Sequence, residues 1–131
     1  MKIEDIKFKA KRLDNGEWII GSFVVMKIPA LSKTTIGIVA AGGATLHEVD
    51  PSTVCQFTGL KDCEGNEVWN HDLLRSPCRE EGSIYEVSWG KEDGGFIVKE
   101  SVSGGRLLTF LCPVLTLFKF KVIGNKFDKE K

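Results

Sequence analysis

Apolar and polar residues alternate with a period close to two along most of this chain. Between Ile6 and Lys11 every second residue is a lysine, and short runs with the same period recur around Tyr85 and Phe120. Successive side chains of a β-strand point to opposite faces of a sheet, so this alternation is typical of strands with one buried face. The pattern predicts a mainly β protein whose many short strands are separated by glycine-containing turns.

Asn15-Gly16 predicts the first hairpin, because both residues tolerate the positive φ angles of a two-residue type I′ loop. Such a loop would pair Leu13 with Trp18, Phe8 with Phe23 and Ile6 with Val25. Apolar residues then face apolar residues at each of these pairs, and a slip of one residue would move them to the wrong face.

Asp93-Gly94 predicts a second hairpin by the same argument. A two-residue loop there places Trp89 opposite Val98, on the same face as Tyr85, Val87 and Phe96. We therefore expect Trp89 to lie in the core and to be worth roughly 3–5 kcal/mol of stability.

The remaining chain predicts further short elements. Residues 35–40 and 45–49 flank Gly42-Gly43 as a third hairpin, and Asp50 caps one helical turn that starts at Pro51. Asp62 to Gly65 has the composition of a type I turn between strands 56–60 and 67–69. The other predicted elements are a strand at 70–75, a polar loop at 77–83, a break at Gly104-Gly105, an edge strand or bend at Pro113 and a last strand at 119–123 that ends at Gly124.

Length and charge limit the classes of protein. A chain of 131 residues is long enough for one domain with its own core. It carries 18 basic and 18 acidic residues, so a protein built mainly to hold nucleic acid or anionic lipid is not expected.

Cysteines and apolar segments favour a cytoplasmic protein with free thiols. The four cysteines show no CxxC pair, and the first residues show no signal peptide, so no metal, cofactor or disulfide is expected. The longest apolar stretch, residues 107–118, is shorter than the about 20 residues that a membrane helix needs, and no membrane partner is expected.

The segment from Val49 to Trp69, VDPSTVCQFTGLKDCEGNEVW, resembles the signature of the YopX family of bacteriophage and prophage proteins. Similar blocks occur in the same order at residues 6–10, 87–96 and 122–125, so the resemblance covers about residues 6–127. It implies a mainly β fold with a small SH3-like barrel, an origin in a phage or prophage, and no established biochemical role. One domain over residues 1–131 is expected, with an N-terminal β-hairpin region at about 1–55, at most one short helical turn and the barrel at about 56–127. Asn70-His71 stands where family members usually have Glu-Gly.

No motif predicts an enzyme. Residues 37–44 have glycine spacing similar to a phosphate-binding loop, but Gly43 replaces the lysine and Ala44 the hydroxyl that such a loop requires. His71 could be combined with Cys63, Cys78 or Asp72 as a metal or nucleophile set, yet no local spacing supports that over a surface histidine.

Association is the predicted role, with three candidate surfaces. The first is Thr58, Gly59, Leu60, Lys61 and Asp62, either a recognition loop or a turn that sets strand register. The second is the apolar stretch with Leu115 and Leu117, which is either covered by the N-terminal sheet or, as the favoured prediction, forms a homo-oligomer, most simply a dimer. The expected partners are the chain itself and an unidentified phage or host protein.

The third surface is basic and supports a disfavoured alternative, weak nucleic-acid binding through Lys7, Lys9 and Lys11. These lysines would form a wider stripe with Lys119 and Lys121 if the first and last strands were neighbours. The three tryptophans could stack on bases, although a core position for Trp89 argues against it.

Overall fold

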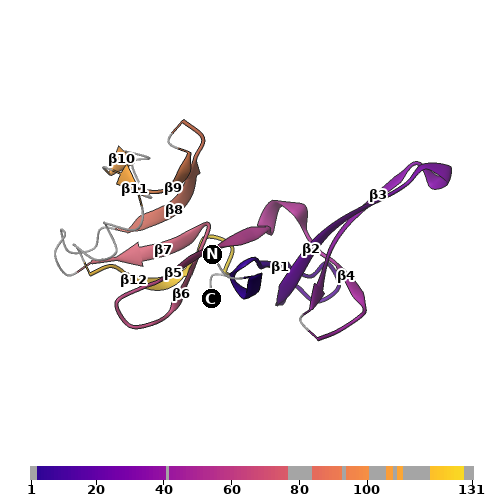
Figure 1. Ribbon diagram of the computed structural model, residues 1–131, viewed down its shortest axis with the longest axis horizontal. Helices are drawn as coiled ribbons and strands as arrows, with labels where there is room; N and C mark the ends of the chain where they lie inside the picture. The colour runs from indigo at the N-terminus through magenta and orange to yellow at the C-terminus, as the bar shows by residue number, and fades with distance from the viewer. Residues whose placement is uncertain are drawn as a thin grey trace. The chain divides into compact units, whose positions relative to one another are not determined.

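The computed structural model describes residues 3–40, 42–76, 84–92, 94–100, 106–107, 109–110 and 119–128. Their regular structure is strand, with helix only as short 3-10 turns, so the predicted mainly β class is confirmed. The strands are β1 (Phe8–Lys11), β2 (Trp18–Ile28), β3 (Lys33–Ala40), β4 (Leu46–Glu48), β5 (Cys55–Lys61), β6 (Glu67–Trp69), β7 (Asp72–Arg75), β8 (Tyr85–Gly90), β9 (Gly95–Glu100), β10 (Arg106–Leu107), β11 (Thr109–Phe110) and β12 (Lys121–Asn125) (Figure 1).

Two antiparallel sheets contain these strands. The first has the order β4-β3-β2-β1-β5-β6, and the second has the order β10-β9-β8-β7-β12, with β11 also paired to β9. The described strands form open sheets, so the predicted closed barrel is not found among them and its SH3-like character is not confirmed. Strand β6 pairs with β5, and its Val68 packs into an apolar core with Phe120 and residues of β7, β8 and β9.

The chain divides into two compact units, Met1–Phe57 and Thr58–Lys131. The core of the first unit is Ala10, Ile38 and Val49, with five half-buried apolar side chains around it: Phe8, Ile19, Phe23, Ile36 and Val54. The core of the second unit is larger and consists of Val68, Leu74, Tyr85, Val87, Val98 and Phe120. Each unit therefore buries its own apolar cluster.

The described residues form three 3-10 turns where at most one was predicted: Ile3–Asp5, Pro29–Leu31 and Pro51–Thr53. The predicted turn is the last one, and the Asp50 side chain caps it by accepting a hydrogen bond from the Ser52 N–H at 3.0 Å. Pro29 begins the turn that joins β2 to β3, as proline favours the first helical position.

The predicted register of the first hairpin is wrong by two residues. Phe8 pairs with Gly21 and Lys11 with Trp18, and the Arg12 N–H donates to the Glu17 carbonyl at 2.9 Å, so the loop holds the four residues 13–16 instead of two. Gly16 alone has a positive φ, 70°, and its N–H donates to the Arg12 carbonyl at 2.9 Å. The Asn15 side chain accepts from the Glu17 N–H instead of adopting a left-handed backbone. A shift of two keeps every side chain on its predicted face, and Phe8 still meets Phe23 diagonally, with ring centroids 5.6 Å apart.

The second hairpin shows the same difference. Trp89 pairs with Phe96 instead of Val98, and the Gly94 N–H, at φ 68°, donates to the Gly90 carbonyl. Trp89 lies at the end of β8 and is 53% exposed, touching Phe96 edge to face. The predicted core position of Trp89 is therefore wrong, because the alternation continues past the part of the sheet that the core covers.

The third hairpin, between β3 and β4, and the turn from Asp62 to Gly65 are confirmed. The strand predicted at 70–75 begins two residues later, because Asn70 and His71 form a turn in which His71 takes a positive φ of 70°. β12 begins at Lys121, two residues after its predicted start, with Lys119 at a positive φ of 51°, and it continues through Gly124 to Asn125, past its predicted end. The predictions for residues 77–83, Gly104-Gly105 and Pro113 lie outside the described residues.

Gly21 marks a close approach of β2 to β3 in the first unit. A Cβ on this residue would overlap the Val39 carbonyl oxygen and lie 2.8 Å from its carbon, and both atoms belong to the β3 backbone. The pairing of β2 with β3 therefore requires glycine at this position.

We expect Gly21→Ala to lower the free energy of unfolding by about 3 kcal/mol or more, since backbone cannot yield as a side chain can. Gly43→Ala is the matched control, because its nearest contact is an ordinary 3.4 Å to the Ala40 carbonyl oxygen, and it should stay within about 0.5 kcal/mol. Urea unfolding of both variants measures the difference. Equal stability of the two variants would contradict the close approach.

Candidate functional site

The predicted interaction segment from Thr58 to Asp62 forms the end of β5 and the start of the next turn. Thr58 is buried, and its hydroxyl donates to the Val68 carbonyl at 2.7 Å and accepts from the Leu60 N–H at 3.2 Å. Gly59 has a φ of 83°, which explains why glycine stands there. Gly59 and Lys61 are exposed, so they remain the predicted contact residues of this segment.

Asp62 is buried and accepts four hydrogen bonds. Its Oδ1 accepts from the N–H groups of Glu64 at 2.9 Å and Asn66 at 2.8 Å. Its Oδ2 accepts from the Asn66 side chain at 3.2 Å and from the Val122 N–H at 2.9 Å. The last bond joins the β5–β6 turn to β12. The Asp62 side chain therefore stabilises the turn and holds β12 beside it.

Burial raises the pKa of the Asp62 carboxyl, but the hydrogen bonds from Val122, Asn66 and Glu64 favour the charged form more strongly. The net effect holds the pKa of Asp62 below its ordinary value of 3.8. The folded state therefore favours the ionised carboxylate.

The other predicted association residues, Leu115 and Leu117, lie outside the described residues. Self-association through them stays a prediction.

The basic residues of β1 lie beside aromatic rings. The Lys7 ammonium is 4.7 Å from the centre of the Phe57 ring, and the ammonium groups of Lys9 and Lys11 are 4.7 and 4.9 Å from Trp18. These five residues are called the lysine–aromatic face. β12 pairs with β7, whereas β1 pairs with β2 and β5, so the wider stripe that required adjacent first and last strands is not formed by strand pairing.

The hairpin of β2 and β3 extends beyond the strands that flank it (Figure 1). β1 pairs with β2 only up to Gly21, and β4 pairs with β3 only from Gly37 onward. Residues 22–36 are called the arm. Within the described part of the chain, no strand pairs with residues 22–28 on the side away from β3.

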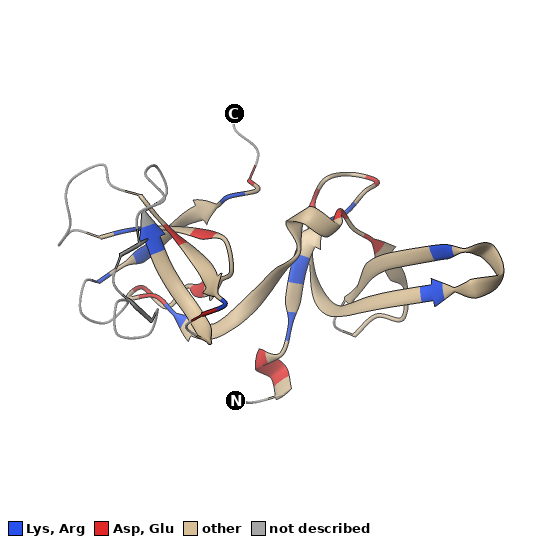
Figure 2. Ribbon diagram, turned by 90° about the horizontal axis from the view of Figure 1, so that it is seen from above, with Lys and Arg blue, Asp and Glu red and all other residues tan. Residues whose placement is uncertain are grey.

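The arm carries exposed apolar side chains on both faces. Val25 is 50% exposed on one face, Met26 is 44% exposed on the other, and Leu31 at the tip is 68% exposed. Lys27 and Lys33 are the only charged residues in the arm, and Figure 2 shows basic positions without acidic ones along it. Sequence reasoning missed this surface because strand alternation at β2 was assigned to a buried face along its whole length.

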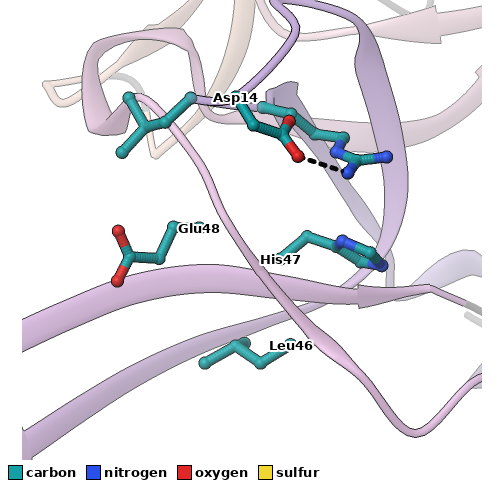
Figure 3. Close-up of a pocket in the computed structure, with 6 residues that line it drawn as sticks. Asp14, Leu46, His47 and Glu48 are labelled. Carbon is teal, nitrogen blue, oxygen red and sulfur yellow. Dashed lines mark hydrogen bonds and ion pairs between the residues drawn. The ribbon is translucent and has the colours of Figure 1, made fainter.

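An open cavity of about 340 Å³ in the first unit is lined by Arg12, Leu13, Asp14, Leu46, His47 and Glu48 (Figure 3). Arg12 pairs with Asp14 at 2.6 Å, and its guanidinium holds the pKa of the Asp14 carboxyl below its usual range. His47 and Glu48 are successive strand residues and point in opposite directions. None of the described residues that line this cavity is a serine, threonine or cysteine, so they provide no hydroxyl or thiol for a histidine to activate.

Among the described residues, His71, Cys63 and Asp72 form no group that could hold a metal ion. The His71 Nδ1 lies 3.2 Å from the buried Glu86 carboxylate, which sequence reasoning did not select. The Asp72 carboxylate is buried and accepts from the Trp69 N–H at 2.7 Å and from the Asn125 side chain at 2.9 Å. The Glu86 and Asp72 carboxylates therefore both stabilise the turn at Asn70-His71. Cys78 lies outside the described residues.

Gly37, the first glycine of the loop-like spacing, lies within β3. A Cβ there would be 2.7 Å from the His47 carbonyl oxygen, so this glycine permits close pairing of β3 and β4. Among the described residues, no group of histidine, cysteine, aspartate and glutamate side chains could hold a metal ion, and no helix could span a membrane. The Cys55 thiol is buried and donates to the Thr53 carbonyl at 3.3 Å, whereas the Cys63 thiol is exposed.

The fold and these surfaces define a β protein with two small antiparallel sheets and an extended apolar arm. A scan against family models matches the YopX protein family over residues 7–130, and the chain belongs to this family. No curated protein matches the chain.

We expect Asp62→Asn to lower the free energy of unfolding at pH 7 by about 1.5–3 kcal/mol, because the hydrogen bonds to a charged acceptor are weakened. The folded-state pKa lies below the unfolded one, so this contribution is present above pH 4 and is lost as the pH falls through the folded-state pKa. Denaturant unfolding between pH 2 and pH 7 should show the two proteins converging at low pH. Glu64→Gln, a change at an exposed residue of the same turn, is the control and should show no comparable loss of stability at pH 7. A difference in the free energy of unfolding between Asp62→Asn and the parent protein that does not change with pH would contradict this role of the carboxylate.

Proposed function

We propose that this YopX-family chain is a non-enzymatic protein-association module of phage or prophage origin that works in the cytoplasm and binds through its arm. The exposure of Val25, Met26 and Leu31 carries this proposal. Exposed apolar side chains that gather on one element with few charges among them favour an interface at that element.

The geometry of the arm adds support. A two-stranded hairpin in water is only marginally stable without a covering layer. The core of the first unit reaches Phe23 and Ile36 but does not include Val25 or Met26. A protein that covers the outer part of the arm would therefore bury apolar side chains and stabilise the hairpin together.

The absence of an enzymatic role is part of the proposal. The described lining of the cavity at Arg12 and His47 contains no hydroxyl or thiol, and the Asp62 and Asp72 carboxylates are occupied by hydrogen bonds that fix the fold. These arrangements favour association over catalysis.

A second candidate function is weak binding of single-stranded nucleic acid at the lysine–aromatic face. The observation that favours it is that the ammonium groups of Lys9 and Lys11 both lie over the ring of Trp18, since cations and stacking rings together hold single strands. It ranks second because the chain has no net positive charge. Binding there would weaken steeply with added salt, whereas apolar association through the arm would not.

We expect a photoreactive phenylalanine analogue in place of Met26 to form a covalent adduct with a protein when it is irradiated in cells that make the chain. The adduct should disappear when Val25→Lys is added, because a charge then enters the apolar surface. The control position is Ile123, an exposed apolar residue of β12. Adducts from both positions, or from neither, would contradict binding through the arm.

A further inference from the structure

We infer that the protein covering the arm is a second copy of this chain, paired antiparallel through the free edge of β2 at residues 22–28. This inference rests on the proposed function and names its partner. The two copies would form one continuous sheet across a two-fold axis, with the same residues contributed by each.

The free edge of β2 lacks the features that usually prevent such pairing. Exposed edge strands are generally protected by charges, proline, bulges or a short length. Residues 22–28 are seven in a row with one charged residue, Lys27, and no proline, and β2 pairs with β3 in unbroken register from Gly21 to Ile28. The edge is therefore regular, mostly apolar and long enough for a partner strand.

The sequence of this edge is complementary to itself. Antiparallel pairing centred on Val25 places Val24 opposite Met26 and Phe23 opposite Lys27 of the other copy. No two lysines face each other, and each ammonium group falls beside an aromatic ring, as already occurs in the lysine–aromatic face. The two exposed Val25 side chains meet at the axis and cover each other.

This pattern favours a second copy over other occupants. Nucleic acid would need more cations than Lys27 and Lys33, and it would leave the apolar side chains uncovered. A foreign extended peptide would need its own apolar alternation and a residue that tolerates Lys27, whereas residues 22–28 of another copy already provide both.

We expect light scattering coupled to gel filtration to show a mass that rises with concentration from 14.5 kDa to twice that value. Val25→Lys would place two ammonium groups together at the axis and should raise the dissociation constant at least tenfold. Ala30→Lys is the matched control, because it adds the same charge to the exposed tip of the arm, outside the strand edge, and should change the constant less than twofold. Circular dichroism of each variant shows that it is folded.

Three results would overturn the inference. One is a monomer at all concentrations, and another is equal weakening by Val25→Lys and Ala30→Lys. The third is a dimer that dissociates when Leu115 and Leu117 become lysine but persists in Val25→Lys. If the chain is a monomer and the photoreactive group at Met26 still captures a different protein, then the second copy is wrong and association through the arm stands.

Discussion

Strand β2 pairs with β3 along eight residues but with β1 along only four, and this difference in length shapes the first unit. Where β1 lies beside β2, the sheet has a core on one face, and the lysine–aromatic face covers the other. Beyond Gly21 the same alternating sequence continues, but no described strand or core residue covers Val25 and Met26. The arm follows from a strand that is longer than its neighbours.

Close approach at glycine makes this extension possible. Gly21 lets β2 lie against the Val39 carbonyl, and Gly37 lets β3 lie against the backbone of β4. The arm is thereby anchored at its base by backbone pairing on a small core. In the second unit the anchoring is polar: Asp62 joins its turn to Val122, and Asp72 joins its own turn to Asn125. Both carboxylates are buried acceptors, and each connects segments more than fifty residues apart.

Much of this architecture could be predicted from the sequence, because the period of two and the turn residues are local signals. The Asp50 cap, the turn after Asp62 and all three hairpins are where those signals placed them. The registers of two hairpins were wrong by two residues, since Asn15-Gly16 and Asp93-Gly94 were interpreted as complete loops. A single left-handed glycine closes a four-residue loop equally well, and alternation cannot distinguish registers that differ by two.

The functional surface was less predictable for a related reason. Alternation indicates which residues share a face, but it does not show how far along a strand that face is covered. Trp89 and Val25 both continue an apolar face beyond the end of the core, and both are exposed. The Glu86 partner of His71 was also missed, because the turn that brings them together depends on His71 adopting a positive φ.

Hydrogen exchange of the backbone amides of residues 22–28, measured at several protein concentrations, tests the role of the free edge most directly. If a second copy pairs with β2, protection of amides on this edge should increase with concentration. Amides of Lys9 and Ala10, which lie in the interior strand β1, should keep the same protection throughout. Exchange at residues 22–28 that does not change with concentration would contradict the pairing of two copies through β2.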